Sequence, residues 1–178
     1  MPSPLGHALA GAAAGWAIAP AASLSLDRER SLIWRQGALF ALAGMLPDLD
    51  LLLFTVHRGP THSIAAAAII GLVVGTASRR WRAGLAAGAA YGTHVLLDWL
   101  GTDTAPPIGL MVLWPVTDNY FQSDAHLFQA ISRRYWQHHF WDHNLRAVGW
   151  ELVMLVPPAA VALWVRLRRL EGARRARG

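Results

Sequence analysis

Histidine and aspartate residues recur near the ends of apolar segments in this 178-residue sequence, where they could bind a metal ion together. His94 and Asp98 are four residues apart in THVLLDWLGTD, so on a helix they would share one face. An imidazole and a carboxylate so placed can hold one divalent cation, although a pair on an ordinary helix surface has the same spacing. The apolar surroundings favour the metal interpretation, because ionisable groups there are costly and usually mark function.

Similar side chains lie near the ends of other apolar segments. The sequence places Asp48 and Asp50 in LPDLD, His57 and His62 in HRGPTHS, and His7 at the start of the first segment. Each has an ordinary alternative, since aspartate caps helices and a single histidine is often a core or interfacial residue. The predicted metal ligands are His7, Asp48, His62, His94 and Asp98. His57 is a secondary candidate, and Asp50 could be a ligand, a general base or a helix cap.

The chain contains no cysteine, so a metal site here must use imidazole and carboxylate ligands. Three imidazoles with two or three carboxylates suit zinc, with manganese or iron as alternatives. Carboxylates can bridge two ions, and metal-bound water becomes a nucleophile because its pKa falls. Asp50 could then accept a proton, and the planar guanidinium of Arg58 could meet a phosphate. Arg58 could equally be a solvated loop residue.

A second polar cluster lies in residues 101–146. It consists of His126, His138, His139, Asp142 and His143. A second metal site or an exposed histidine-rich helix would both account for it. Asp103 is a further candidate ligand, and we expect Glu151 to face the interior and support the site.

Five apolar segments must position these side chains. They run from about Leu5 to Leu26, Leu32 to Leu46, Ile64 to Ala77, Ala83 to Leu100 and Ala147 to Trp164. Apolar residues make up 54% of the chain and charged residues only 15%, which is low for a soluble domain. The pattern predicts one all-α domain over residues 1–178, a polytopic membrane bundle of four to five helices. A soluble bundle of very hydrophobic helices is the alternative. Residues 101–146 would form an extracytoplasmic cap, helical from about Ser123 to His143.

The distribution of arginine predicts an orientation in the membrane. All 16 basic residues are arginine, and 12 of them fall on one side if every segment crosses the bilayer. The positive-inside rule makes that side cytoplasmic, with the C-terminus there and the N-terminus and metal site outside. Since the arginines then act as orientation signals, the basic charge does not call for nucleic acid as a partner.

The motifs GHALAG, LPDLD, HRGPTHS, HVLLDWLGTD and LWPV resemble those of the bacterial membrane-bound metal-dependent hydrolases. This family is also described as LexA-binding, inner-membrane-associated hydrolases. The resemblance covers roughly residues 5 to 118, and the combination is far more specific than any single motif. It implies a helical, multi-pass inner-membrane protein with hydrolase activity.

A more distant resemblance is to zinc-dependent phospholipase C, an all-helical bundle with a cluster of up to three metal ions. The five predicted ligands follow that family's order of His, Asp, His and an H-x-x-x-D pair. The resemblance implies that Asp98 bridges two ions, with Asp48, His62 and His94 on one and His7 on the other. His126, His139 and His143 would stand for the ligands of a third ion. The last of these is a glutamate in that family, which puts a third ion in doubt.

The sequence therefore predicts a metal-dependent hydrolase of the bacterial inner membrane. Its substrate would be a phosphoester or a lipid-linked small molecule, cleaved by metal-activated water. The alternatives are a non-catalytic metal-binding membrane protein, for transport or structure, and a regulatory protein-interaction module. The sequence carries no signal for an oligomeric state.

Overall fold

The fold is described from a computed structural model covering residues 1–19, 26–53 and 57–175. Its long helices are α1 (Pro4–Ile18), α2 (Leu26–Met45), α4 (Ile64–Ser78), α5 (Trp81–Leu100) and α6 (Phe140–Arg175). Three short elements stand between α2 and α4: η1 (Leu46–Leu49), α3 (Asp50–Leu53) and η2 (Pro60–His62). The described residues form no strand beyond two isolated bridges, so the predicted all-α class is confirmed.

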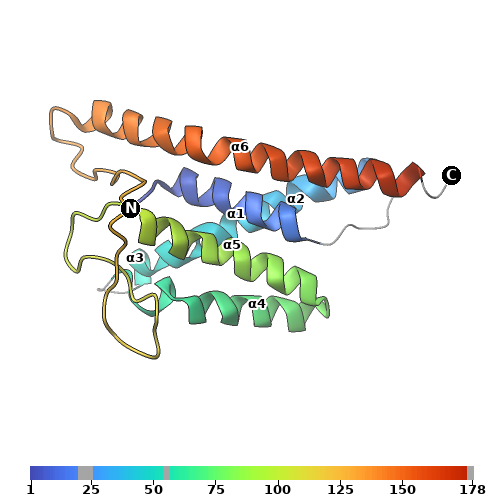
Figure 1. Ribbon diagram of the computed structural model, residues 1–178, viewed down its shortest axis with the longest axis horizontal. Coiled ribbons are helices and arrows are strands. Elements are labelled where there is room, and N and C mark those ends of the chain that lie inside the picture. Colours follow the sequence, from blue (N-terminus) through green and yellow to red (C-terminus); the bar gives the residue numbers. More distant parts are fainter. Residues whose placement is uncertain (20–25, 54–56, 176–178) are drawn as a thin grey trace.

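The long helices run along a common direction (Figure 1). Helix α5 packs on α1, α2 and α4, and α1 packs on α2 and α6. The start of α1 and the end of α5 lie at the end of the bundle that carries α3 (Figure 1). The turn between α4 and α5 and the end of α6 lie at the opposite end. The motifs LPDLD and HRGPTHS are therefore brought beside His7 and the end of α5.

Small residues allow two helix pairs to approach until their backbones touch. A Cβ atom on Gly84 of α5 would collide with the carbonyl oxygen of Gly71 on α4. A Cβ atom on Gly44 of α2 would lie 2.5 Å from the carbonyl oxygen of His7 on α1 and 3.1 Å from Cα of Gly11. Contacts this close are typical of helices that pack through glycine in a membrane environment.

Helix α6 holds both ends of α1 with buried charges. At the start of α1, the backbone N–H of Ser3 donates to Glu151 Oε1 at 2.7 Å, and the Ser3 hydroxyl donates to Glu151 Oε2. At the other end, the Arg166 guanidinium donates to the carbonyl oxygen of Ala19. A carboxylate at a helix N-terminus and a cation at its C-terminus both complement the helix dipole. This clamp fixes the helix that carries His7.

The prediction of four to five membrane-spanning helices is wrong. Among the described residues, only α6 is long and apolar enough to cross a membrane, over Phe140–Gly172. Helices α1 and α4 each have 15 residues. At about 1.5 Å per residue they are shorter than the roughly 30 Å hydrocarbon core. Helix α2 begins with the charged sequence LDRER, and arginine, aspartate, histidine and glycine lower the hydropathy of α5.

The predicted helical part of the cap, from Ser123 to His143, is also wrong over most of its length. Residues 101–139 contain no helix, and α6 begins only at Phe140. The cap backbone instead pairs with distant segments. Thr102 donates to the carbonyl oxygen of Phe128 at 2.7 Å, and Leu127 donates to that of Leu100 at 2.8 Å. These long-range hydrogen bonds use the groups that a helix would have paired locally.

We predict that Glu151→Gln lowers the free energy of unfolding by about 1–3 kcal/mol. The glutamine amide has one acceptor oxygen and no negative charge, so one of the two buried Ser3 donors loses its partner. Unfolding of the purified protein in detergent micelles measures this. Glu171→Gln is the matched control, since the Glu171 side chain is 51% exposed and pairs with Arg168 on the same helix. Equal destabilisation by both substitutions would contradict the clamp.

Candidate metal centre

The structure brings the five predicted ligands together at one end of the bundle. They come from four elements: His7 from α1, Asp48 from η1, His62 from η2, and His94 and Asp98 from α5. The three imidazoles have no exposed surface, and Asp98 is 4% exposed. Asp48 is the half-buried member and reaches a cavity above the group.

Four atoms of this cluster have the spacing of ligands around a single ion. His94 Nε2 lies 3.5 Å from Asp48 Oδ1 and 3.3 Å from Asp98 Oδ2. His62 Nε2 lies 3.7 Å and 3.6 Å from the same two oxygens, and 3.1 Å from His94 Nε2. Tetrahedral zinc with bonds of about 2.0–2.1 Å separates its ligand atoms by roughly 3.3–3.4 Å. The observed separations lie on both sides of that value, so the donor set fits zinc.

The hydrogen bonds of the two imidazoles turn their lone pairs toward the centre of this group. His94 Nδ1 donates to the carbonyl oxygen of Gly44 at 2.8 Å, which leaves Nε2 as the lone-pair nitrogen of the neutral ring. His62 Nδ1 donates to the Thr61 hydroxyl oxygen at 3.0 Å and lies 3.2 Å from Asp50 Oδ2, so Nε2 carries the lone pair in the neutral His62 ring as well. Two lone pairs that face each other at 3.1 Å repel, and a cation between them removes that repulsion.

Asp50 lies behind the ligands and orients them. Its carboxylate accepts from His57 Nδ1 at 2.5 Å, the Thr61 hydroxyl at 2.8 Å and the Arg58 backbone N–H at 3.1 Å, in addition to His62. Burial raises the pKa of Asp50, but the imidazole and hydroxyl hydrogen bonds outweigh it and hold the pKa well below the usual value. An ionised carboxylate with four donors positions metal ligands. This arrangement favours a positioning role over the predicted roles of ligand or general base.

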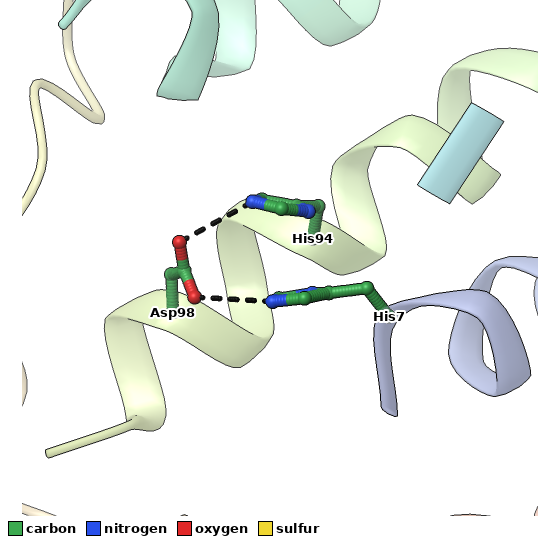
Figure 2. A group of neighbouring side chains, drawn as sticks. All are labelled: His7, His94 and Asp98. Carbon is green, nitrogen blue, oxygen red and sulfur yellow. Dashed lines mark ion pairs between the residues drawn. The ribbon is translucent and has the colours of Figure 1, made fainter. Parts of the chain in front are cut away.

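His7 and Asp98 extend the cluster beyond the four-atom group. His7 Nε2 lies 3.3 Å from Asp98 Oδ1, and the His7 ring stacks on His94 with centroids 3.7 Å apart. Figure 2 shows Asp98 with one oxygen directed at His94 and the other at His7. Asp98 could therefore bridge two ions, but the second position has fewer protein ligands than the first.

The clearest sign of a ligand site is the set of buried polar atoms that make no hydrogen bond. At this cluster they are His7 Nδ1 and Nε2, Asp48 Oδ1, His57 Nε2, and both carboxylate oxygens of Asp98. Buried polar atoms are normally paired, and each exception needs an explanation. A divalent cation would satisfy the imidazole nitrogens and the carboxylate oxygens together.

Asp48 connects the cluster to the cavity. Its Oδ1 atom lies 3.7 Å from His57 Nε2, besides its contacts to His62 and His94. Burial raises the pKa of Asp48, but the close imidazoles of His62 and His94 outweigh burial and hold the pKa well below the usual value. The carboxylate is therefore ionised at neutral pH, as a metal ligand must be.

Arg58 and Asp103 form a buried ion pair at the edge of the cavity. Arg58 Nη1 contacts Asp103 Oδ2, and Arg58 Nη2 donates to the carbonyl oxygen of Ala105 at 2.8 Å. Asp103 also accepts from the Gly109 N–H at 2.9 Å. Arg58 is thus not a solvated loop residue. The sequence predicted that its guanidinium contacts a phosphate, but the guanidinium already binds Asp103 and the carbonyl oxygen of Ala105. Asp103 is likewise committed to the pair and is not placed as a ligand.

The structure does not bring the remaining candidates to the cluster. His126, His138, His139, Asp142 and His143 are exposed, and none belongs to a ligand group among the residues described. His143 Nε2 donates to the carbonyl oxygen of Ala130 at 2.7 Å. Glu151 faces the interior as expected, but it binds Ser3.

Two contributors were missed from the sequence. Thr61 binds Asp50, and the Gly44 carbonyl orients His94. Thr61 lies inside HRGPTHS and Gly44 lies two residues before LPDLD, so proximity to the motifs was the only signal in the sequence.

Above the cluster lies a cavity of about 890 Å³. Its polar lining includes Asp48, His57, Arg58, Asp103, Arg133 and Arg134. The cavity gives a small molecule access to the half-buried ligand Asp48, while the other ligands stay enclosed by protein.

A family model described as YdjM inner membrane protein matches residues 1–170. The match supports an inner-membrane location, and its description names no activity. No curated protein and no solved structure matched the chain.

We predict that Asp50→Asn weakens zinc binding by roughly 10- to 100-fold, because the amide can no longer accept from all four donors that fix the imidazoles. Competition with a chromophoric chelator measures the affinity of the purified protein. Asp142→Asn serves as the control, since Asp142 is exposed and lies outside the cluster. Wild-type affinity in the Asp50 variant would rule out the positioning role.

Proposed function

The chain belongs to the YdjM inner membrane protein family, and we propose that it is a metal-dependent hydrolase of that membrane. The observation that carries the proposal is the convergence of buried, unpartnered imidazole nitrogens and carboxylate oxygens below an open cavity. These atoms lie 3.3–3.7 Å from one another without forming a hydrogen bond, and a cation among them would bind the nitrogens and oxygens together. One ligand, the half-buried carboxylate of Asp48, lies at the cavity, so a substrate in the cavity could reach the bound ion.

We assign the four-atom group of His62, His94, Asp48 and Asp98 as the holder of zinc. If the ion took up a water molecule as a fifth ligand on the cavity side, it would lower the pKa of that water to about 7 and supply a nucleophile at neutral pH. His57 is the residue placed to move a proton. His57 lines the cavity, its Nδ1 donates to Asp50, and its Nε2 makes no hydrogen bond, so Asp50 would stabilise the imidazolium formed when Nε2 accepts a proton.

A phosphoester is the proposed substrate class. The resemblance to metal-dependent hydrolases and, more distantly, to zinc-dependent phospholipase C supports it. The arginines of the cavity lining add a preference for an anion. A membrane location would give the enzyme access to lipid-linked substrates.

We place the cluster on the extracytoplasmic side of the membrane. The site lies at the start of the spanning helix α6, and Arg168, Arg169 and Arg175 lie near its end. By the positive-inside rule, the arginine-bearing end of α6 faces the cytoplasm.

The test is hydrolysis by zinc-loaded protein in detergent micelles, with phosphatidic acid, phosphatidylglycerol and bis-p-nitrophenyl phosphate as substrates. We expect turnover of at least one substrate, its loss after chelation, and a rate at least about 100-fold lower in Asp98→Asn. Asp142→Asn should keep the wild-type rate. Turnover that survives complete metal removal would refute the proposal. Tight zinc binding without any turnover would favour the alternative of a non-catalytic metal-binding protein.

A further inference from the structure

The cap carries two arginines whose charges are not balanced by a neighbouring acid. Arg133 and Arg134 are exposed and line the cavity above the metal cluster. Among the described residues, neither forms an ion pair. The other guanidinium at this cavity, that of Arg58, is already paired with Asp103.

The segment that carries these arginines is held firmly in place. Asn144 of α6 binds Ser132 twice, accepting from its N–H at 2.8 Å and donating to its carbonyl oxygen at 3.0 Å. His143 donates to the carbonyl oxygen of Ala130 at 2.7 Å. Three hydrogen bonds from the first turns of α6 therefore fix the backbone immediately before Arg133. A recognition residue benefits from such fixation, because less freedom is lost when a ligand binds.

Positive charges accumulate on this side of the cavity. Burial and the nearby charge of Arg133 both lower the pKa of Arg58. The acidic groups of the lining are committed, since Asp103 pairs with Arg58 and Asp48 lies against the imidazoles. Positive charges that line one cavity without a free acid make its potential favourable for an anion.

We infer that Arg133 and Arg134 form an anion-recognition site in the cap that binds a phosphate group carried by the substrate. This site takes the role that the sequence suggested for Arg58. The planar guanidinium group can donate two hydrogen bonds to the oxygens of a phosphate. Two arginines favour a phosphate monoester over a zwitterionic headgroup, because the monoester carries more net negative charge. The inference rests on the proposed function for the reaction, whereas the binding can be tested separately.

The experiment measures calorimetrically the affinities of the zinc-loaded full chain for inorganic phosphate, dihexanoyl phosphatidic acid and dihexanoyl phosphatidylcholine. We expect binding of the first two and a roughly 10- to 100-fold loss in the double variant Arg133→Gln/Arg134→Gln. Arg146→Gln is the matched control, because Arg146 is exposed, lies close in sequence and does not line the cavity. Its affinities should equal those of the wild type. Thermal unfolding checks that all variants are folded.

The two phosphate sources are distinguished by their relative affinities. Tighter binding of phosphatidic acid indicates a lipid headgroup, and equal affinities indicate recognition of the phosphate alone. Wild-type affinity in the double variant, an equal loss in Arg146→Gln, or no binding of either phosphate by the wild type would overturn the inference. A His94→Ala variant separates the two sites. Phosphate binding that survives in it supports the cap site even if hydrolysis fails, and binding lost only there would place the anion on the metal and overturn the inference.

Discussion

The close approach of α1 and α2 at Gly44 is the constraint on which the metal centre depends. A side chain at this position would meet the carbonyl oxygen of His7, so only glycine lets α1 carry His7 this deep into the bundle. The carbonyl oxygen of the same residue accepts from His94 Nδ1 and turns the Nε2 lone pair toward the other ligands. One residue of α2 therefore sets the position of a ligand on α1 and the orientation of a ligand on α5.

The remaining buried carboxylates are hydrogen-bonded or ion-paired in systems of their own. Asp50 accepts from two imidazoles, a hydroxyl and an amide, and Arg58 pairs with Asp103. Glu151 closes the start of α1. In the described part of the chain, unpartnered imidazole nitrogens and carboxylate oxygens are instead concentrated at the ligand cluster. Since unpaired buried polar atoms are costly, this contrast is what separates a ligand site from a structural network.

The ligand residues could be singled out from the sequence because ionisable groups in apolar segments are rarely accidental. The i,i+4 spacing of His94 and Asp98 needed only helical geometry. The roles of Asp50 and Arg58 could not be predicted, since Arg58 meets Asp103 across 45 positions of sequence. The number of spanning helices was overestimated, because apolar composition alone does not show how long each helix is or what it packs against. The irregular structure of the cap could not be predicted, because its backbone hydrogen bonds join residues far apart in the sequence and leave no local sequence pattern.

X-ray absorption at the zinc K-edge of the purified full-length protein tests the central claim most directly. We expect bound zinc with four or five nitrogen or oxygen neighbours at about 2.0–2.1 Å, together with the outer-shell scattering of two imidazoles. The His94→Ala variant should lose the ion or show one imidazole fewer. Protein that takes up no zinc, or zinc without imidazole scattering, would contradict the account.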